Sequence, residues 1–547
     1  MKPDLKWQGV LDLLKKVLLI YDLPFNAAGT TSDYVEAFSK YSQHDIYLLP
    51  AGQETLGELP ETLELSRFDI VIIHYSIVIS HDNHLSPRSR RLLREFDGLK
   101  AVFVQDDYRW INETVNALDY MKVDVLFPLT EPSIMNQVYD PKRLPNIKRQ
   151  TVLTGYVPES LLTLEVLPYA ERSIDVGYRA RKLPAWIGSH SLQKWQIAER
   201  FIADSKIYNL KNDISTKEED RIYQENWVEF ISNCKATLGT ESGASLCDFT
   251  GQIQKDVEEH EDKYPGTDFE TLKSLYFKDQ DCAIMMNVIS PRVFEAAALK
   301  TLMIFYDGEY SGVLKPDVHY VLLEKDHSNF EKVIDTLRNP DRAEEIIDNA
   351  YQEVAQNERY SYKGMVRLVE KTLEEKWSSG NYLPSSYPIT RDDFEICLAV
   401  EESIFEKEVK KTESEELINE VEDEKAKSEE LINEVEFEKL RLRDILIILA
   451  SSIVLVVYII LKSVWGIFPV GVRNSVGVRL RSKNFSSYLK GPRETALEKT
   501  RKIWRLIPAG PRLLMANSIL NPMIDPDRAE KNIVWIIIII LAVKIFV

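Results

Sequence analysis

The chain has 547 residues, 44% of them hydrophobic, and a formal net charge of −18 at pH 7, a composition that leaves room for two or three globular domains. Residues 1–443 alone carry −27, which makes nucleic acid an unfavourable partner for that part of the chain. The cysteines show no CxxC spacing, which argues against a disulfide framework or a zinc site and fits a reducing compartment: Cys234, Cys247, Cys282 and Cys397.

Strand and helix patterns alternate through the first part of the chain. No small-residue cleavage site follows the first apolar residues, so we expect no secretory signal peptide. Apolar runs predict strands at 17–22, 45–50, 68–76, 101–107, 124–129 and 150–156. This alternation predicts a parallel α/β sheet, in which ligands bind beyond the carboxyl ends of the strands. The residues expected at those ends are Gly29, Thr30, His74, Gln105, Asp106 and Asp107.

The same alternation restarts near Ser173 and continues to residue 377. A Gly/Ser turn ends the strand predicted at 236–245, and closing helices follow residue 323. We therefore predict two α/β domains, at 1–165 and 166–380, joined near residues 157–172. A cleft between two such domains is the default position for a ligand.

The stretch 287–306, NVISPRVFEAAALKTLMIFY, predicts a capped helix followed by a buried strand. Ser290 is a suitable N-cap and Pro291 fits the first helical position. Arg292 and Glu295 share one face of the first turn. The N-terminus of a helix can hold a phosphate, and a carboxylate just inside it can accept hydrogen bonds from a ribose. The alternative is a surface helix with a solvated Arg–Glu pair.

A highly charged segment at 398–443 follows the second domain. It repeats SEELINEVE with a period of 14 residues, which is two heptads. Charged and polar residues also occupy seam positions, so the repeat predicts at most a weak coiled coil. A homodimer through 399–443 and a single solvated helical stalk both fit this pattern.

Two apolar segments, 445–461 and 533–547, flank a basic segment at 473–531 within the tail 444–547. The first is long enough to enter a bilayer and to span it as a transmembrane helix, and the basic segment suits an anionic membrane surface. A nucleic-acid-binding tail is the weaker alternative. The positive-inside rule assigns the basic segment to the cytoplasm, and a first segment that lies in the interface or re-enters would leave the body there too.

Residues 15–377 resemble a GT-B glycosyltransferase of the "glycosyl transferases group 1" type. The most specific part is ISPRVFEAAALKTLMIF, which is similar to the family element R-x-F-E-A-x-A-x-G-x-x-x-I. The resemblance implies two Rossmann-like domains that face a cleft, and it implies that Glu295 binds the donor ribose. Two positions depart from the family pattern: Lys300 stands where Gly is usual, and Asn287 stands where many members carry a second Glu.

The resemblance also implies the remaining site residues. Basic side chains after the first strand of the second domain hold the diphosphate, and the loop 239–245 faces the sugar. The expected donor-binding residues are Arg179, Arg181, Lys194, Glu241, Ser242, Ser290, Arg292 and Glu295. His74 and Asn287 are the candidate catalytic residues, although a structural role for His74 is equally consistent with its position. Asp106 and Asp107 resemble a metal element only weakly and equally fit helix caps, so we expect no metal ion.

The predicted function is a metal-independent, hexosyltransferase-like glycosyltransferase. A nucleotide-sugar acts as co-substrate, no other cofactor is expected, and the acceptor is a membrane-associated glycan or lipid-linked intermediate of polysaccharide biosynthesis. The expected location is the membrane, with the catalytic body on its cytoplasmic face. Two alternatives remain: a non-catalytic GT-B-like membrane scaffold, which the departures at Asn287 and Lys300 favour, and a nucleotide-sugar epimerase, which the membrane tail disfavours.

Overall fold

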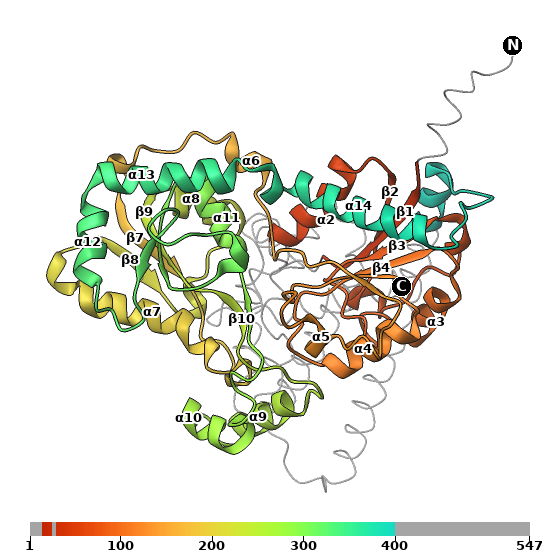
Figure 1. Cartoon of the computed structure of the whole chain (residues 1–547), viewed down its shortest axis with the longest axis horizontal. Helices are drawn as coiled ribbons and strands as arrows, with labels where there is room; N and C mark the ends of the chain where they lie inside the picture. The colour runs from red at the N-terminus through yellow and green to blue at the C-terminus, as the bar shows by residue number, and fades with distance from the viewer. Residues whose placement is uncertain (1–13, 24–28, 400–547) are drawn as a thin grey trace, which may run out of the picture. The chain divides into compact units, whose positions relative to one another are not determined.

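A computed structural model describes residues 14–23 and 29–399 (Figure 1). Two α/β halves follow one another along the chain, each built on its own parallel sheet. The parallel α/β organisation predicted from the sequence is therefore confirmed. The predicted stalk at 398–443 and the segments of the tail at 444–547 lie outside the described residues, apart from the first two positions of the stalk. Within the described residues, no helix combines the length and apolarity needed to cross a membrane.

The N-terminal half contains a six-stranded sheet in the order β2-β1-β3-β4-β5-β6. All its strand pairs are parallel, and the inner strands are apolar on both faces, as expected for a sheet covered by helices. Its strands are β1 (Lys16–Tyr21), β2 (Asp45–Pro50), β3 (Ile70–Ile73), β4 (Leu99–Phe103), β5 (Val125–Phe127) and β6 (Lys148–Arg149). The accompanying helices are α2 (Gly29–Tyr41), α3 (Pro87–Glu95), α4 (Ile111–Tyr120) and α5 (Met135–Val138).

The C-terminal half contains a five-stranded parallel sheet in the order β13-β12-β9-β7-β8. Its strands are β7 (Ile174–Arg179), β8 (Asn212–Ser215), β9 (Cys234–Gly239), β12 (Leu302–Tyr306) and β13 (Val321–Leu323). Its helices are α6 (Glu159–Leu162), α7 (His190–Ser205), α8 (Gln224–Ser232), α11 (Pro291–Ala298), α12 (Phe330–Arg338) and α13 (Pro340–Ala350). An antiparallel ribbon of β10 (Ser242–Ala244) and β11 (Met286–Val288) brackets α9 (Gln252–Lys263) and α10 (Phe269–Leu272).

In each sheet there is one point on either side of which the connections between strands run in opposite directions across the sheet. In the N-terminal sheet this switch point lies between β1 and β3, and in the C-terminal sheet it lies between β7 and β9. Ligands of open α/β sheets bind at the carboxyl ends of the strands beside such a point. His74 directly follows β3, Arg179 ends β7, and Glu241 follows β9, so the topology places three predicted site residues at the two switch points.

The last long helix, α14 (Tyr362–Ser379), returns to the N-terminal half (Figure 1). It buries Met365, Val366 and Val369 in the core of the N-terminal sheet, and the carboxylate of Glu370 accepts a hydrogen bond from the hydroxyl of Ser42 in that half. The predicted boundary at residue 380 assigned this helix to the second domain. An amphipathic pattern predicts an apolar face but does not predict which sheet covers it. In the structure this face packs on the sheet of the N-terminal half.

Candidate functional site

The helix α11 begins as the sequence predicts. Ser290 occupies the N-cap with an extended backbone, and Pro291 is the first helical residue. The Ser290 side chain makes no capping hydrogen bond. Val293, Phe294 and the three alanines that follow are buried in the core of the C-terminal half. The buried face fixes the helix against its sheet and leaves Arg292 and Glu295 on the opposite side.

Glu295 is held by a residue from another helix. The indole Nε1–H of Trp227, on α8, donates to Glu295 Oε2 at 2.7 Å. Burial raises the pKa of Glu295, while the hydrogen bond from Trp227 and the charge of Arg292 act in the opposite direction. The guanidinium of Arg292 lies 4.7 Å from the centre of the Trp227 ring, and its Nη1 donates to the carbonyl of Arg179. Trp227 therefore joins two residues that the sequence predicts to bind the donor.

Three cationic side chains influence one another near the start of α11. Lys194, on α7, donates to the hydroxyl of Ser242 at 3.0 Å. Burial and the nearby positive charges of Arg292 and Arg181 lower the pKa of Lys194 to about 8. No carboxylate of the described residues forms an ion pair with Lys194, Arg181 or Arg292. Such a group of cations without a paired carboxylate suits a polyanion such as a diphosphate.

The guanidinium of Arg179, by contrast, is already engaged in contacts within the protein. Its Nη2 forms an ion pair with Asp213 at 2.7 Å, its Nε donates to the carbonyl of Asp220, and the group lies 4.5 Å from the centre of the Phe230 ring. These contacts fix the carboxyl end of β7 to β8 and α8. In this arrangement Arg179 supports the site, and Arg181 and Lys194 are the side chains left to meet an anion.

Glu241 also makes contacts within the protein. Its Oε1 accepts the backbone N–H groups of Glu309 and Tyr310, at 3.1 and 2.8 Å, and so fixes the loop that follows β12. Its own carbonyl accepts a hydrogen bond from His190 Nε2 at 3.0 Å. Ser242 pairs with Val288 across the ribbon, next to Gly243 and Asn287. The ribbon thus places Asn287 and Ser242 close together, as the predicted sugar site requires, and Asn287 Oδ1 is buried with no hydrogen-bond partner among the described residues.

His74 is fully buried at the end of β3. Its Nδ1 accepts the backbone N–H of Ser76 at 3.2 Å, so the proton of the neutral ring lies on Nε2. Burial lowers the pKa of His74 to about 3, and within the described part of the chain Nε2 has no partner. The ring is therefore neutral near pH 7, and it offers a hydrogen-bond donor rather than a base at Nε2.

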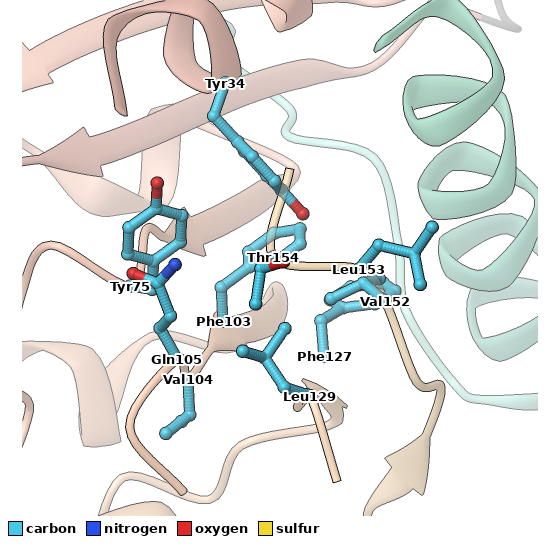
Figure 2. A pocket seen from close by; sticks show the side chains of 10 residues that line it. All are labelled: Tyr34, Tyr75, Phe103, Val104, Gln105, Phe127, Leu129, Val152, Leu153 and Thr154. Carbon is cyan, nitrogen blue, oxygen red and sulfur yellow. The ribbon is translucent and has the colours of Figure 1, made fainter. Parts of the chain in front are cut away.

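A narrow, largely apolar pocket lies at the carboxyl edge of the N-terminal sheet (Figure 2). Tyr34 reaches into it from α2, and the hydroxyl of Tyr34 is buried without a partner in the described residues. Thr154, which also lines the pocket, donates to the carbonyl of Ile289, one residue before the N-cap of α11. The pocket therefore adjoins the start of α11. Its lining is Tyr34, Tyr75, Phe103, Val104, Gln105, Phe127, Leu129, Val152, Leu153 and Thr154.

The two adjacent aspartates after β4 have different environments. Asp107 is buried, and its Oδ2 accepts the backbone N–H groups of Leu129 and Thr130, each at 2.7 Å. Asp106 is exposed and accepts a hydrogen bond from Tyr108 at 3.2 Å. Asp107 therefore joins β4 to β5 and is not available as a ligand. No group of three potential metal-binding side chains occurs among the residues that the structure describes.

Sequence reasoning missed the residues that support the site. Trp227 lies 68 positions before Glu295, and Asp213 lies 34 positions after Arg179. His190 is buried at the start of α7 with no described partner for Nδ1, and burial lowers its pKa to about 4. The sequence carries one local signal for them, since α7 and α8 each follow a strand of the C-terminal half.

Comparison with known proteins gives one family match. Residues 276–369, which include β11, α11 and β12, match the family described as glycosyl transferase-like. No curated protein matches the chain. Among solved structures, an alpha-glucosyltransferase in complex with UDP and a 13-mer DNA is 11% identical, with a TM-score of 0.40 over 65% of this chain and 100% of that chain.

Two further structures are similar at the same level. HepE from Anabaena in complex with UDP is 9% identical, with a TM-score of 0.39 over 66% of this chain and 100% of that chain. Sucrose-phosphate synthase from Thermosynechococcus elongatus is 9% identical, with a TM-score of 0.40 over 67% of this chain and 100% of that chain. The family match confirms the resemblance predicted from the sequence for residues 276–369, which are similar to the glycosyl transferase-like family and contain the stretch 287–306.

Proposed function

We propose that the chain transfers a sugar from a nucleotide-sugar donor to a membrane-associated glycan or lipid-linked acceptor. The observation that carries the donor proposal is the group of Lys194, Arg181 and Arg292 beside the N-terminus of α11. A departing nucleoside diphosphate gains negative charge in the transition state, and preorganised cations stabilise that charge. In this proposal Glu295, one turn into the same helix, accepts hydrogen bonds from the donor ribose.

In this proposal the three cations, rather than a metal ion, neutralise the diphosphate. Lys194, with a pKa of about 8, is largely protonated at pH 7, and an anion bound beside it favours the charged form further. Asn287 and Ser242 on the β10–β11 ribbon contact the sugar. His74 donates a hydrogen bond from Nε2 at the switch point of the acceptor half.

The acceptor proposal is supported by the composition of the tail. The apolar segments 445–461 and 533–547, with the basic segment between them, suit a membrane surface. We propose that they keep the body at the cytoplasmic face, next to a glycan or lipid-linked acceptor.

Calorimetric titration of the full-length chain tests the donor site. We expect one of UDP, GDP, ADP or dTDP to bind, and Lys194→Ala to weaken that binding by about tenfold or more, the value of one charge-assisted hydrogen bond. Binding of the parent nucleoside, which lacks phosphate, stays unchanged. Lys332→Ala, which removes an exposed lysine of α12, serves as the control. Equal diphosphate affinity in Lys194→Ala and wild type would remove Lys194 from the site.

A further inference from the structure

Four side chains from three elements form a continuous set of contacts around Glu295. Arg292 lies over the Trp227 ring at 4.7 Å, the Trp227 and Phe230 ring centres are 5.8 Å apart, and Arg179 lies over Phe230 at 4.5 Å. Arg292 in turn donates to the carbonyl of Arg179. The Trp227 indole thus contacts both Arg292 and Phe230, and its single N–H points to the Glu295 carboxylate.

The hydrogen bond from Trp227 makes the two carboxylate oxygens of Glu295 different. Oε2 accepts from Trp227 at 2.7 Å, whereas no hydrogen bond to Oε1 occurs within the described part of the chain. An indole N–H is a donor only, so it cannot satisfy the hydroxyl donor of a ligand in place of the carboxylate. The surroundings therefore fix one oxygen and leave the other to accept.

We propose that Trp227 is a positioning residue for donor recognition: its N–H holds Glu295 by Oε2 and so presents Oε1 to a ribose hydroxyl. This inference rests on the proposed function of the site. The carboxylate reaches its binding orientation before the ligand arrives, so less side-chain freedom is lost on binding. Because Arg292 packs on the same ring, Trp227 also joins the ribose subsite to the group of cations that faces the diphosphate.

The variant Trp227→Phe separates this role from simple packing, because phenylalanine keeps an aromatic ring beside Arg292 and Phe230 but has no N–H. The probes are the tightest-binding nucleoside diphosphate of the panel, its 2′,3′-dideoxy analogue and inorganic pyrophosphate, each titrated into the full-length chain. Trp195→Phe, on α7, controls for the loss of a partly exposed tryptophan.

We expect wild type to bind the dideoxy analogue about tenfold more weakly than the parent nucleotide. In Trp227→Phe the parent nucleotide binds roughly five- to tenfold more weakly than in wild type, and the penalty for the missing hydroxyls falls below about threefold. Affinity for pyrophosphate, which has no hydroxyls, stays within about twofold of wild type if the cations are undisturbed. Trp195→Phe behaves as wild type with all three probes.

Two results would overturn the inference. If Trp227→Phe loses as much affinity as wild type when the ribose hydroxyls are removed, Glu295 is oriented without the indole. An equal loss of nucleotide and pyrophosphate affinity would show that Trp227 only maintains the packing of the site. If wild type binds no nucleoside diphosphate at all, the proposed function fails and the ribose role of Trp227 fails with it.

If no nucleoside diphosphate binds, NMR spectroscopy still shows whether the hydrogen bond between Trp227 and Glu295 is present. The indole ¹⁵N–H resonance that disappears in Trp227→Phe belongs to Trp227, and we expect Glu295→Gln to shift it because the acceptor loses its charge. A shifted resonance without nucleotide binding leaves the hydrogen bond intact and refutes its role in donor recognition. An unshifted resonance refutes the hydrogen bond itself.

Discussion

Lys300 has a left-handed backbone, with φ of 52°, directly after the end of α11. Its N–H donates to the carbonyl of Ala297 at 3.3 Å, and the next N–H returns to Ala296 at 2.9 Å, which closes the helix. Glycine adopts this conformation without a Cβ penalty, and the related family usually has glycine here. The Nζ of Lys300 lies 4.4 Å from the centre of the Tyr351 ring, which offsets part of the cost. This departure therefore belongs to the helix end and not to the site.

We expect Lys300→Gly to raise the free energy of unfolding by about 0.5 kcal/mol, since about 1 kcal/mol of backbone strain is relieved and part of a cation–π contact is lost. Lys300→Ala keeps the strain and loses the contact, so it lowers stability instead. Urea denaturation of the two full-length variants measures both values. Loss of nucleotide affinity in Lys300→Gly would show instead that Lys300 belongs to the site.

At the scale of elements, Asp281 joins the start of α7 to the end of β10. It accepts from the backbone N–H of Ser189 at 3.0 Å, from the hydroxyl of Ser245 at 2.7 Å and from Lys273 at 2.6 Å. Burial alone would raise the pKa of Asp281, but the hydrogen bonds from Lys273, Ser189 and Ser245 outweigh it and lower the pKa to about 2. These contacts hold the first turn of α7, the turn that precedes Lys194.

The lowered pKa of Asp281 determines how the free energy of unfolding changes with pH. The stabilisation is fully present above the ordinary aspartate pKa of about 4 and is lost as the pH falls toward 2. We expect Asp281→Asn to cost about 1–2 kcal/mol of unfolding free energy at pH 7, and the difference from wild type to shrink between pH 4 and 2. Denaturant titrations at pH 7, 5 and 3 measure it, with exposed Asp279→Asn as the control. A difference that does not change with pH would contradict the charge-based explanation.

How far the sequence predicts an element depends on whether its signal is local. The cap of α11 and the apolar strand runs are local, so the start of α11 and the alternation of strands and helices follow from the residues themselves. The partners of Glu295 and Arg179 are not local, because Trp227 and Asp213 come from other elements that meet only in the folded sheet. The sequence therefore predicts which residues carry charge near the donor site, but not which of those charges are already paired.

At the scale of the whole described body, the halves are connected by more than the linker near residue 157. The helix α14 and the segment after it pack on the N-terminal half, where the hydroxyl of Tyr47 donates to the carbonyl of Ile389 at 3.0 Å. Charges of the two halves also interact: burial, Glu36 and Glu295 together raise the pKa of Asp33, on α2, to about 6. The pKa of an acidic group of the first half thus depends on the Glu295 carboxylate of the second.

A raised pKa has the opposite consequence for stability. The contribution of Asp33 is most favourable below its ordinary pKa of about 4 and declines as the pH rises through 6. We expect Asp33→Asn to stabilise the chain by about 1 kcal/mol at pH 7.5, after allowance for solvent screening, and to have little effect at pH 4. Thermal unfolding at the two pH values measures this. Glu95→Gln on α3 is the control, and a loss of stability at pH 7.5 would contradict the assignment.

Turnover by the full-length chain tests whether it transfers a sugar from a nucleotide donor. The chain is incubated with UDP-, GDP-, ADP- and dTDP-linked sugars in the presence of a membrane lipid and glycan extract, and release of the nucleoside diphosphate is followed together with labelling of the extract. We expect one donor to give acceptor-dependent release, with Lys194→Ala at least about tenfold slower. No release from any donor by a chain that retains its native melting temperature would contradict the claim.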